Sequence, residues 1–157
     1  MKSKTLIQVT LTAIILTTVF LASCGGDKNE KKSTTPKIEV KKEVTVDPMQ
    51  DKGIGPVASV TLGPIDQALA DKGKEEFNAK CKACHRINKR YIGPSPKGIM
   101  ERRSPEWIMN MILNPEEMVQ KNAIARKLLM EYSAPMANQN LTQDQARAVL
   151  EYFRTLK

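Results

Sequence analysis

Cys81-Lys82-Ala83-Cys84-His85 is the stretch of sequence from which the rest of the chain is best interpreted. Two cysteines separated by two residues and followed at once by histidine form the C-x-x-C-H pattern of covalent haem attachment. Each thiol can add to one vinyl group of a haem, and the adjacent histidine is then delivered beneath the iron as its proximal ligand. His85 is the only histidine of the chain, so no site that needs two imidazoles can be built. The motif therefore predicts one haem c attached at Cys81 and Cys84, with His85 as an iron ligand.

Two other uses of a Cys-x-x-Cys pair fit this sequence less well. A structural zinc site needs four Cys or His ligands, but the only further cysteine is Cys24, which lies in a separate N-terminal motif. A thioredoxin-like redox pair normally sits beside a strand-helix-strand unit, which the composition around the motif does not offer. Two exposed free thiols would also be a liability in any chain that is exported to an oxidising compartment. Haem attachment is the interpretation that uses both cysteines and the histidine.

The region around the motif has the composition of a helical domain. Of the 157 residues, those from 66 to 157 include only two Val and two Thr beside many Ala, Leu, Met, Lys and Glu. These common residues favour helices, whereas strands need β-branched side chains. A β sandwich and a doubly wound α/β fold are therefore excluded, and an all-α domain is expected. Residues 66–157 also carry 16 Lys and Arg against 11 Asp and Glu, which supplies most of the formal net charge of +8.

Start signals and apolar periodicity predict four helices. Ser104 followed by proline, and Asn114 followed by proline, are typical of helix starts. Thr142 and Gln145 have the spacing of a capping box, and Ala146, Val149, Leu150 and Phe153 form one apolar stripe behind them. The predicted helices run from Asp66 to about Lys80, from Ser104 through Ile112, from Asn114 to Tyr132 with a break near Lys121 and Asn122 left open, and from Thr142 through Phe153.

Gly73 lies on the inner face of the first predicted helix, with Leu69 and Phe77 four residues away on either side. A glycine inside a helix costs about 1 kcal/mol relative to alanine, so its presence calls for a structural reason. We expect a close crossing between this helix and the side of the last helix that carries Tyr152 and Phe153.

The first 23 residues have the layout of an export signal. A short basic stretch is followed by an apolar run and by small residues before Cys24. Leu-Ala-Ser-Cys followed by glycine resembles the lipobox of bacterial lipoproteins, which implies cleavage before Cys24 and lipid attached to its sulfur. The alternative, an uncleaved transmembrane helix, has a run of only about 18 residues to span the bilayer. We predict a removed signal peptide over residues 1–23, a lipidated Cys24 with a flexible tether and arm over 24–65, and a haem domain over 66–157.

Several features of residues 66–157 together resemble a class I cytochrome c. These are an amphipathic helix, the C-x-x-C-H motif, Gly93-Pro94, Trp107, a Pro135-Met136 loop and a final amphipathic helix. Cytochromes of the four-helix-bundle type carry their haem motif close to the C-terminus, whereas 72 residues follow His85 here. The resemblance implies an all-α cytochrome c fold of about four helices wrapped around one covalently attached haem.

The distal ligand of the iron has to be something other than histidine, and a thioether is the usual answer. Six methionines follow the motif, and three of them sit at helical spacing among apolar residues, where packing is expected. The resemblance places the distal ligand at Met136, in a loop directly after Pro135, with Met130 and Met100 as alternatives. The three methionines that we predict to belong to the core are Met109, Met111 and Met130; the sixth is Met118.

Further contacts to the haem follow from the resemblance and from side-chain chemistry. The carbonyl of Pro94 would accept the Nδ1–H of His85 and fix its tautomer, although Gly-Pro can also be a simple turn. Asn138 or Asn140 would donate to the sulfur of Met136, or would serve only as turn residues. The candidates for holding the haem propionates through side-chain donors are Trp107, Tyr91, Arg102 and Arg103.

A haem iron ligated by histidine and methionine has no open coordination position, so it suits electron transfer better than substrate chemistry. We therefore predict an electron carrier rather than an enzyme, working between quinol-oxidising membrane complexes and a terminal reductase or oxidase. The alternatives are a haem enzyme or gas sensor with a labile distal ligand, and a fixed cytochrome subunit of a respiratory complex.

The charge around the motif indicates the kind of partner. Between Lys80 and Arg103 there are eight basic residues and one acidic residue, which favours redox partners with acidic docking surfaces. A merely solvated basic face is the alternative, and nucleic acid is not an expected partner. The export signal and the lipid anchor together predict a haem domain held at a membrane, in the periplasm.

Overall fold

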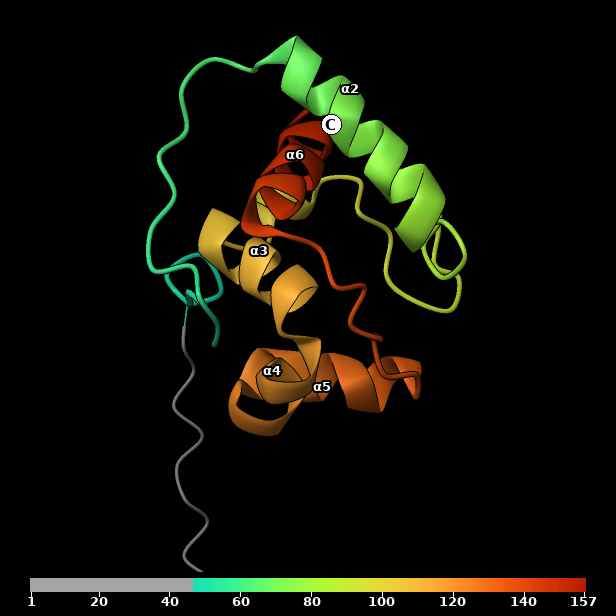
Figure 1. Cartoon of the computed structure of the whole chain (residues 1–157). Coiled ribbons are helices and arrows are strands. Elements are labelled where there is room, and N and C mark those ends of the chain that lie inside the picture. Colours follow the sequence, from blue (N-terminus) through green and yellow to red (C-terminus); the bar gives the residue numbers. More distant parts are fainter. Residues whose placement is uncertain (1–46) are drawn as a thin grey trace, which may run out of the picture. The chain divides into compact units, whose positions relative to one another are not determined.

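The computed structural model describes residues 47–157, so the predictions on the export signal, Cys24 and the first part of the tether lie outside the described residues. In the described part the chain is all-α, as predicted, and forms no sheet (Figure 1). None of its helices is long and apolar enough to cross a membrane. The elements are α2 (Gln67–Glu76), the π-helical turn η1 (Phe77–Cys81), the 3-10 turn η2 (Ile99–Glu101), α3 (Pro105–Leu113), α4 (Pro115–Lys121), α5 (Ala123–Tyr132) and α6 (Gln143–Arg154).

Helices α2 and α6 cross closely, and Gly73 is the residue that allows it (Figure 1). A β-carbon at Gly73 would lie 1.9 Å from the carbonyl oxygen of Ala148. One turn further along, the ring of Phe77 packs against Tyr152 and Phe153, with centroid distances of 5.7 and 5.8 Å. The predicted crossing is confirmed, but its details differ. Gly73 faces Ala148, and it is Phe77 that faces the two aromatic residues.

The last helix starts and packs as its sequence predicts. The Thr142 hydroxyl accepts from the N–H of Gln145 at 3.2 Å, and the Gln145 side chain accepts from the N–H of Thr142 at 2.9 Å. These two bonds complete the capping box and satisfy two donors that the first turn leaves free. The predicted apolar stripe is buried along its whole length and consists of Ala146, Val149, Leu150 and Phe153.

The segment predicted to be helical from Asn114 to Tyr132, with a break near Lys121 and Asn122 left open, is two helices. Asn122 has extended backbone angles, φ −92° and ψ 126°, so α4 ends there. Its side-chain oxygen accepts from the N–H of Ala125 at 2.9 Å and starts α5. Asparagine is suited to this because its side chain replaces a backbone hydrogen bond of the helix. The described chain therefore has five α-helices, not about four.

Residues 51–65, predicted to belong to the tether and arm, lie along the helical domain, drawn in teal and green in Figure 1. The buried side chain of Asn110 accepts from the N–H of Val57 at 2.9 Å and donates to two carbonyls of this arm. The N–H of Ile54 donates to the sulfur of Met118 at 2.9 Å. Because these partners are buried in α3 and α4, the arm packs directly on the helical domain.

The end of the arm is held to α6 by a buried carboxylate. Glu151 has no exposed surface and accepts from the N–H of Asp66 at 3.0 Å. Arg147 forms an ion pair with it, and Arg154 donates to it at 2.6 Å and to the carbonyl of Gly63 at 2.6 Å. Burial alone would raise the pKa of Glu151, but these hydrogen bonds and positive charges outweigh it and lower the pKa. The carboxylate stays ionised and ties the arm to the last helix.

Candidate haem-binding site

The C-x-x-C-H motif forms a tight turn where η1 ends. The N–H groups of His85 and Cys84 both donate to the carbonyl of Cys81, at 2.9 and 3.1 Å. Neither Cys81 nor Cys84 is in a disulfide. Burial, followed by the negative charge of Glu76, raises the pKa of the Cys81 thiol to about 11. Two free thiols and one imidazole therefore lie on one turn of chain, as the attachment of one haem requires.

The imidazole of His85 is oriented by the loop that follows it. Its Nδ1 lies 2.8 Å from the carbonyl oxygen of Pro94. A carbonyl only accepts, so Nδ1 carries a proton in this bond, and in the neutral imidazole Nε2 is then the nitrogen with the free lone pair. This hydrogen bond joins the pair of atoms that the resemblance implied. A neutral imidazole with a free Nε2 is the form that binds iron, and a fixed ring orientation favours that ligation.

The backbone of Gly93, directly before Pro94, packs against the imidazole of His85. Its N–H donates to the carbonyl of Cys84 at 2.9 Å, which closes the loop on the motif. A β-carbon at Gly93 would lie 2.5 Å from Cε1 of His85 and 3.0 Å from its Nε2. In the sequence Gly93 stands out only as part of the Gly93-Pro94 pair, and its contact with His85 was not predicted. The signal available was a glycine directly before the proline that orients His85.

We expect Gly93→Ala to damage iron ligation rather than only the fold. The new methyl group would overlap the imidazole and turn it away from its bond to Pro94, because the loop backbone is tied to Cys84. The haem-loaded variant should show a weakened or absent low-spin absorption spectrum. Gly63→Ala is the matched control because nothing lies within 4 Å of that position. Equal spectra for the two variants would contradict this role of Gly93.

The methionines fall into distinct environments. Met136 lies half-buried in the loop between α5 and α6 and packs against the core. Met109 is buried, as predicted, and Met111 is partly buried. Met118 is fully buried and its sulfur is engaged by the arm. The prediction that Met130 belongs to the core is wrong, because its side chain is 69% exposed.

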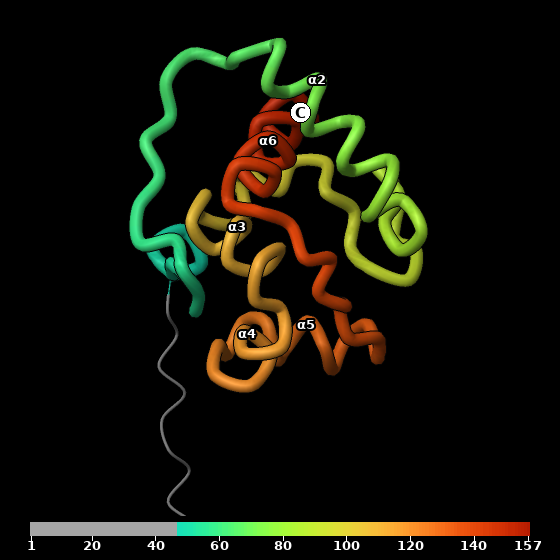
Figure 2. The backbone as a smooth tube through the Cα atoms, viewed as in Figure 1, coloured from blue at the N-terminus to red at the C-terminus, as the bar shows by residue number. Residues whose placement is uncertain are grey.

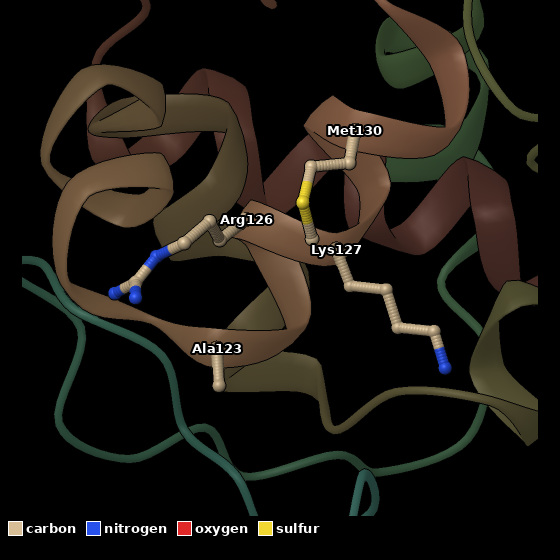
Figure 3. Close-up of a pocket in the computed structure, with 4 residues that line it drawn as sticks. All are labelled: Ala123, Arg126, Lys127 and Met130. Atoms are coloured by element: carbon tan, nitrogen blue, oxygen red, sulfur yellow. The ribbon is translucent and has the colours of Figure 1, made fainter. Parts of the chain in front are cut away.

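The exposure of Met130 follows from the break at Asn122. Helix α5 starts afresh there and sets its own register, with Ala125 completely buried. A position five residues after Ala125 points well away from that inner face. The side chain instead borders a shallow surface depression of about 410 Å³ on α5 (Figure 3), which contains no residue of the haem motif. It is lined by Ala123, Arg126, Lys127 and Met130.

Three of the four candidates for the haem propionates already use their donors within the protein or lie in solvent. The buried indole N–H of Trp107 donates to Asn122 at 3.2 Å. The Arg102 guanidinium donates to the carbonyls of Lys97 and Ser95 at 2.9 and 3.0 Å. Tyr91 is 48% exposed. Propionate contacts by Trp107, Arg102 and Tyr91 stay predictions.

Arg103 differs from the other three candidates. Within residues 47–157, its Nε is the buried side-chain donor that has no hydrogen-bond partner. Its guanidinium lies over the Trp107 ring, 5.2 Å from the centroid. Its Nη1 donates to the carbonyl of Arg102, but a buried N–H without a partner, as at Nε, is unfavourable unless an acceptor approaches it. A carboxylate of a bound haem is a group of the right chemistry, so Arg103 fits the haem better than Arg102 does.

The two asparagines near Met136 act as turn residues. Asn138 donates from its side chain to the carbonyl of Leu113 at 3.4 Å and accepts from the N–H of Asn140 at 2.8 Å. Asn140 has a left-handed backbone, with φ 53°, which asparagine tolerates better than most residues. A hydrogen bond from either residue to the Met136 sulfur stays a prediction.

An all-α domain with a C-x-x-C-H turn and an oriented imidazole is the arrangement of a c-type cytochrome. A family model described as "Cytochrome c" matches residues 70–157. The chain belongs to the cytochrome c family. Membership implies a covalently bound haem c and a role in electron transfer, and Cys81, Cys84 and His85 are the residues that would hold the group.

Solved structures and a curated relative agree with this assignment. Cytochrome c from Rhodothermus marinus is 46% identical, with a TM-score of 0.64 over 65% of this chain and 89% of that one. An engineered form of the same cytochrome is 45% identical, with a TM-score of 0.63 over 65% and 90%. A "Cytochrome c-553-like" protein of Synechocystis sp. is 41% identical over 46 residues, which is 29% of this chain and 44% of that protein. The match to this relative therefore spans less than half of its length.

Proposed function

We propose that this chain is a one-electron carrier whose haem iron is ligated by His85 and Met136. The observation that carries the proposal is the hydrogen bond from His85 Nδ1 to Pro94, which fixes the ring and leaves Nε2 for iron. Such a haem supplies reversible one-electron redox chemistry when it is bound. The chain's own contribution is to hold two ligands in place and to keep other molecules from the iron.

The assignment of Met136 is supported by what the other methionines do. Met109 is buried in the core, Met118 has its sulfur engaged by the arm, and Met130 points into solvent. Of the rest, Met111 lies within α3 and Met100 within η2. Met136 alone among the six lies in an irregular loop between two helices, where a side chain is free to reach a bound group.

The proposed partners are redox proteins with acidic surfaces. The segment from Lys80 to Arg103 carries eight basic residues and one acidic residue, and Lys82, Lys89 and Lys97 on it are exposed. Exposed charges of one sign steer encounters with partners of the opposite sign, and salt weakens the effect. We propose quinol-oxidising complexes as electron donors and a terminal reductase or oxidase as acceptor.

The proposed location is the periplasm, with the domain anchored to a membrane by lipid on Cys24. This rests on the export-signal pattern and on the likeness of Leu-Ala-Ser-Cys to a lipobox. Two or more acyl chains give a durable anchor, at about 0.8 kcal/mol for each buried CH₂ group. Mass spectrometry of membrane-extracted protein would show the lipid, and an unmodified Cys24 would contradict the anchor.

Met136→Ala tests the proposed ligation, with Met130→Ala as the control. In the wild-type ferric holoprotein we expect a low-spin spectrum with the weak near-infrared band typical of methionine ligation. Met136→Ala should lose that band and lower the reduction potential, because thioether ligation stabilises the reduced iron. Met130→Ala should change neither, since its side chain is exposed. High-spin iron in the wild type at neutral pH would instead favour the haem enzyme or gas sensor.

A further inference from the structure

Arg90 connects the loop after His85 to the end of α5. Its Nη1 donates to the carboxylate of Glu131 at 3.1 Å, and its Nη2 donates to the carbonyl oxygen of the same residue at 2.8 Å. The guanidinium also lies over the ring of Tyr132, 4.1 Å from the centroid. One side chain therefore makes three contacts with residues 41 or more positions away in the sequence.

The two hydrogen bonds of Arg90 link the loop of residues 82–95 to α5. Of the hydrogen bonds that residues 82–95 form in the described part of the chain, only the two of Arg90 reach α5. The others stay close to the loop, as in the bonds from His85 to Pro94 and from Gly93 to Cys84. The loop is thus held together by its own hydrogen bonds, and Arg90 attaches it to α5, which is drawn in orange in Figure 2.

The attachment point lies directly before the segment that carries Met136. Ser133 ends α5 in a left-handed conformation, with φ 52°. Within the described residues, Ala134, Pro135 and Met136 form no hydrogen bond; the next anchor is Asn138, at 3.4 Å from the Leu113 carbonyl. A segment with so few hydrogen bonds opens locally at low free energy. Its position therefore depends strongly on how firmly its two ends are held.

We propose that Arg90 acts as a positioning residue for the Met136 segment, the Arg90 latch, and so limits the rate at which the Met136 thioether leaves the iron. The ligand part of this inference rests on the proposed function. Exposed ion pairs are weak one at a time, but here a carboxylate, a helix-terminal carbonyl and an aromatic face all depend on one planar guanidinium. Lysine cannot reproduce that geometry.

Arg86 provides a matched control. It lies in the same loop and stacks over Tyr91, 4.3 Å from the centroid, and it donates to the carbonyl of Lys82. It makes no hydrogen bond or ion pair with α5 in the described residues. Arg86→Ala thus removes the same charge and a comparable aromatic contact while leaving the Arg90 latch in place.

The first measurement is amide hydrogen exchange in the ferric holoprotein. Arg90→Ala should speed exchange of the Ser133 amide about tenfold, because its N–H bonds the Leu129 carbonyl at the end of α5 where Arg90 is attached, and a few weak exposed contacts are lost together. Arg90→Lys should fall between this variant and wild type, and Arg86→Ala should match wild type. Exchange in Arg90→Ala equal to that in Arg86→Ala would overturn the latch, whatever ligates the iron.

The second measurement is the rate of imidazole binding to the ferric iron at saturating imidazole, where release of the native ligand limits the rate. Arg90→Ala should raise this limiting rate about tenfold, in proportion to the faster opening, and Arg86→Ala should leave it unchanged. Faster exchange without faster imidazole binding would overturn the control of the ligand by the latch. Absence of the methionine band in wild type would count against the proposed function instead, because the exchange comparison still decides the latch.

Discussion

Replacing Cys81 and Cys84 together by alanine is expected to yield a haemless chain that is largely unfolded. A domain of about 100 residues buries only some 60 to 70% of the surface of its unfolded chain and is marginally stable without help. Several apolar side chains that pack against the core are only partly buried in this structure, so apolar surface is left for a bound macrocycle to cover. They include Ile87, Ile99, Met100, Met111, Leu128 and Met136.

Far-ultraviolet circular dichroism of the purified double variant measures the loss of helix. The single variant Cys84→Ala is the control, because it keeps the half-buried Cys81 thiol and one thioether bond to the haem. It should retain both haem and helical signal. A double variant that is free of haem and still shows a cooperative thermal transition would contradict the prediction.

Local chemistry explains which parts of the fold were predictable from sequence. Ser104, Thr142 with Gln145, and the break at Asn122 are each read from a side chain that bonds its own helix terminus. The C-x-x-C-H motif likewise works within five residues. Features of this kind depend only on residues close together in the sequence, so they can be predicted from the sequence alone.

Contacts between distant residues left no such signal. Asn110 looks like an ordinary polar residue inside a helix, yet it is buried and binds an arm more than 50 residues away. Arg90 and Glu131 are two exposed charges among many until the fold brings them together. Met130 was assigned to the core from apolar spacing, and the restart of α5 at Asn122 turned it outward. In each case the tertiary arrangement decides what the side chain contacts, because the local sequence pattern is compatible with several different partners.

Gly73→Ala is expected to be strongly destabilising, although alanine is the better helix former by about 1 kcal/mol. The added methyl group would lie 1.9 Å from the oxygen of Ala148 and 2.8 Å from the nitrogen of Val149, which are backbone atoms of α6. Backbone cannot swing aside as a flexible side chain does, so the helices have to separate and loosen the packing of Phe77. Overpacking typically costs about 1 to 3 kcal/mol, and we expect the upper end here.

Guanidinium chloride unfolding of the holoprotein, followed by circular dichroism, measures this loss as a lower midpoint at an unchanged slope. Gly63→Ala makes the same chemical change in open space, with nothing within 4 Å. Its stability should stay within about 0.5 kcal/mol of wild type. If the two variants unfolded at the same denaturant concentration, the contact between α2 and α6 at Gly73 would have to be looser than its geometry indicates.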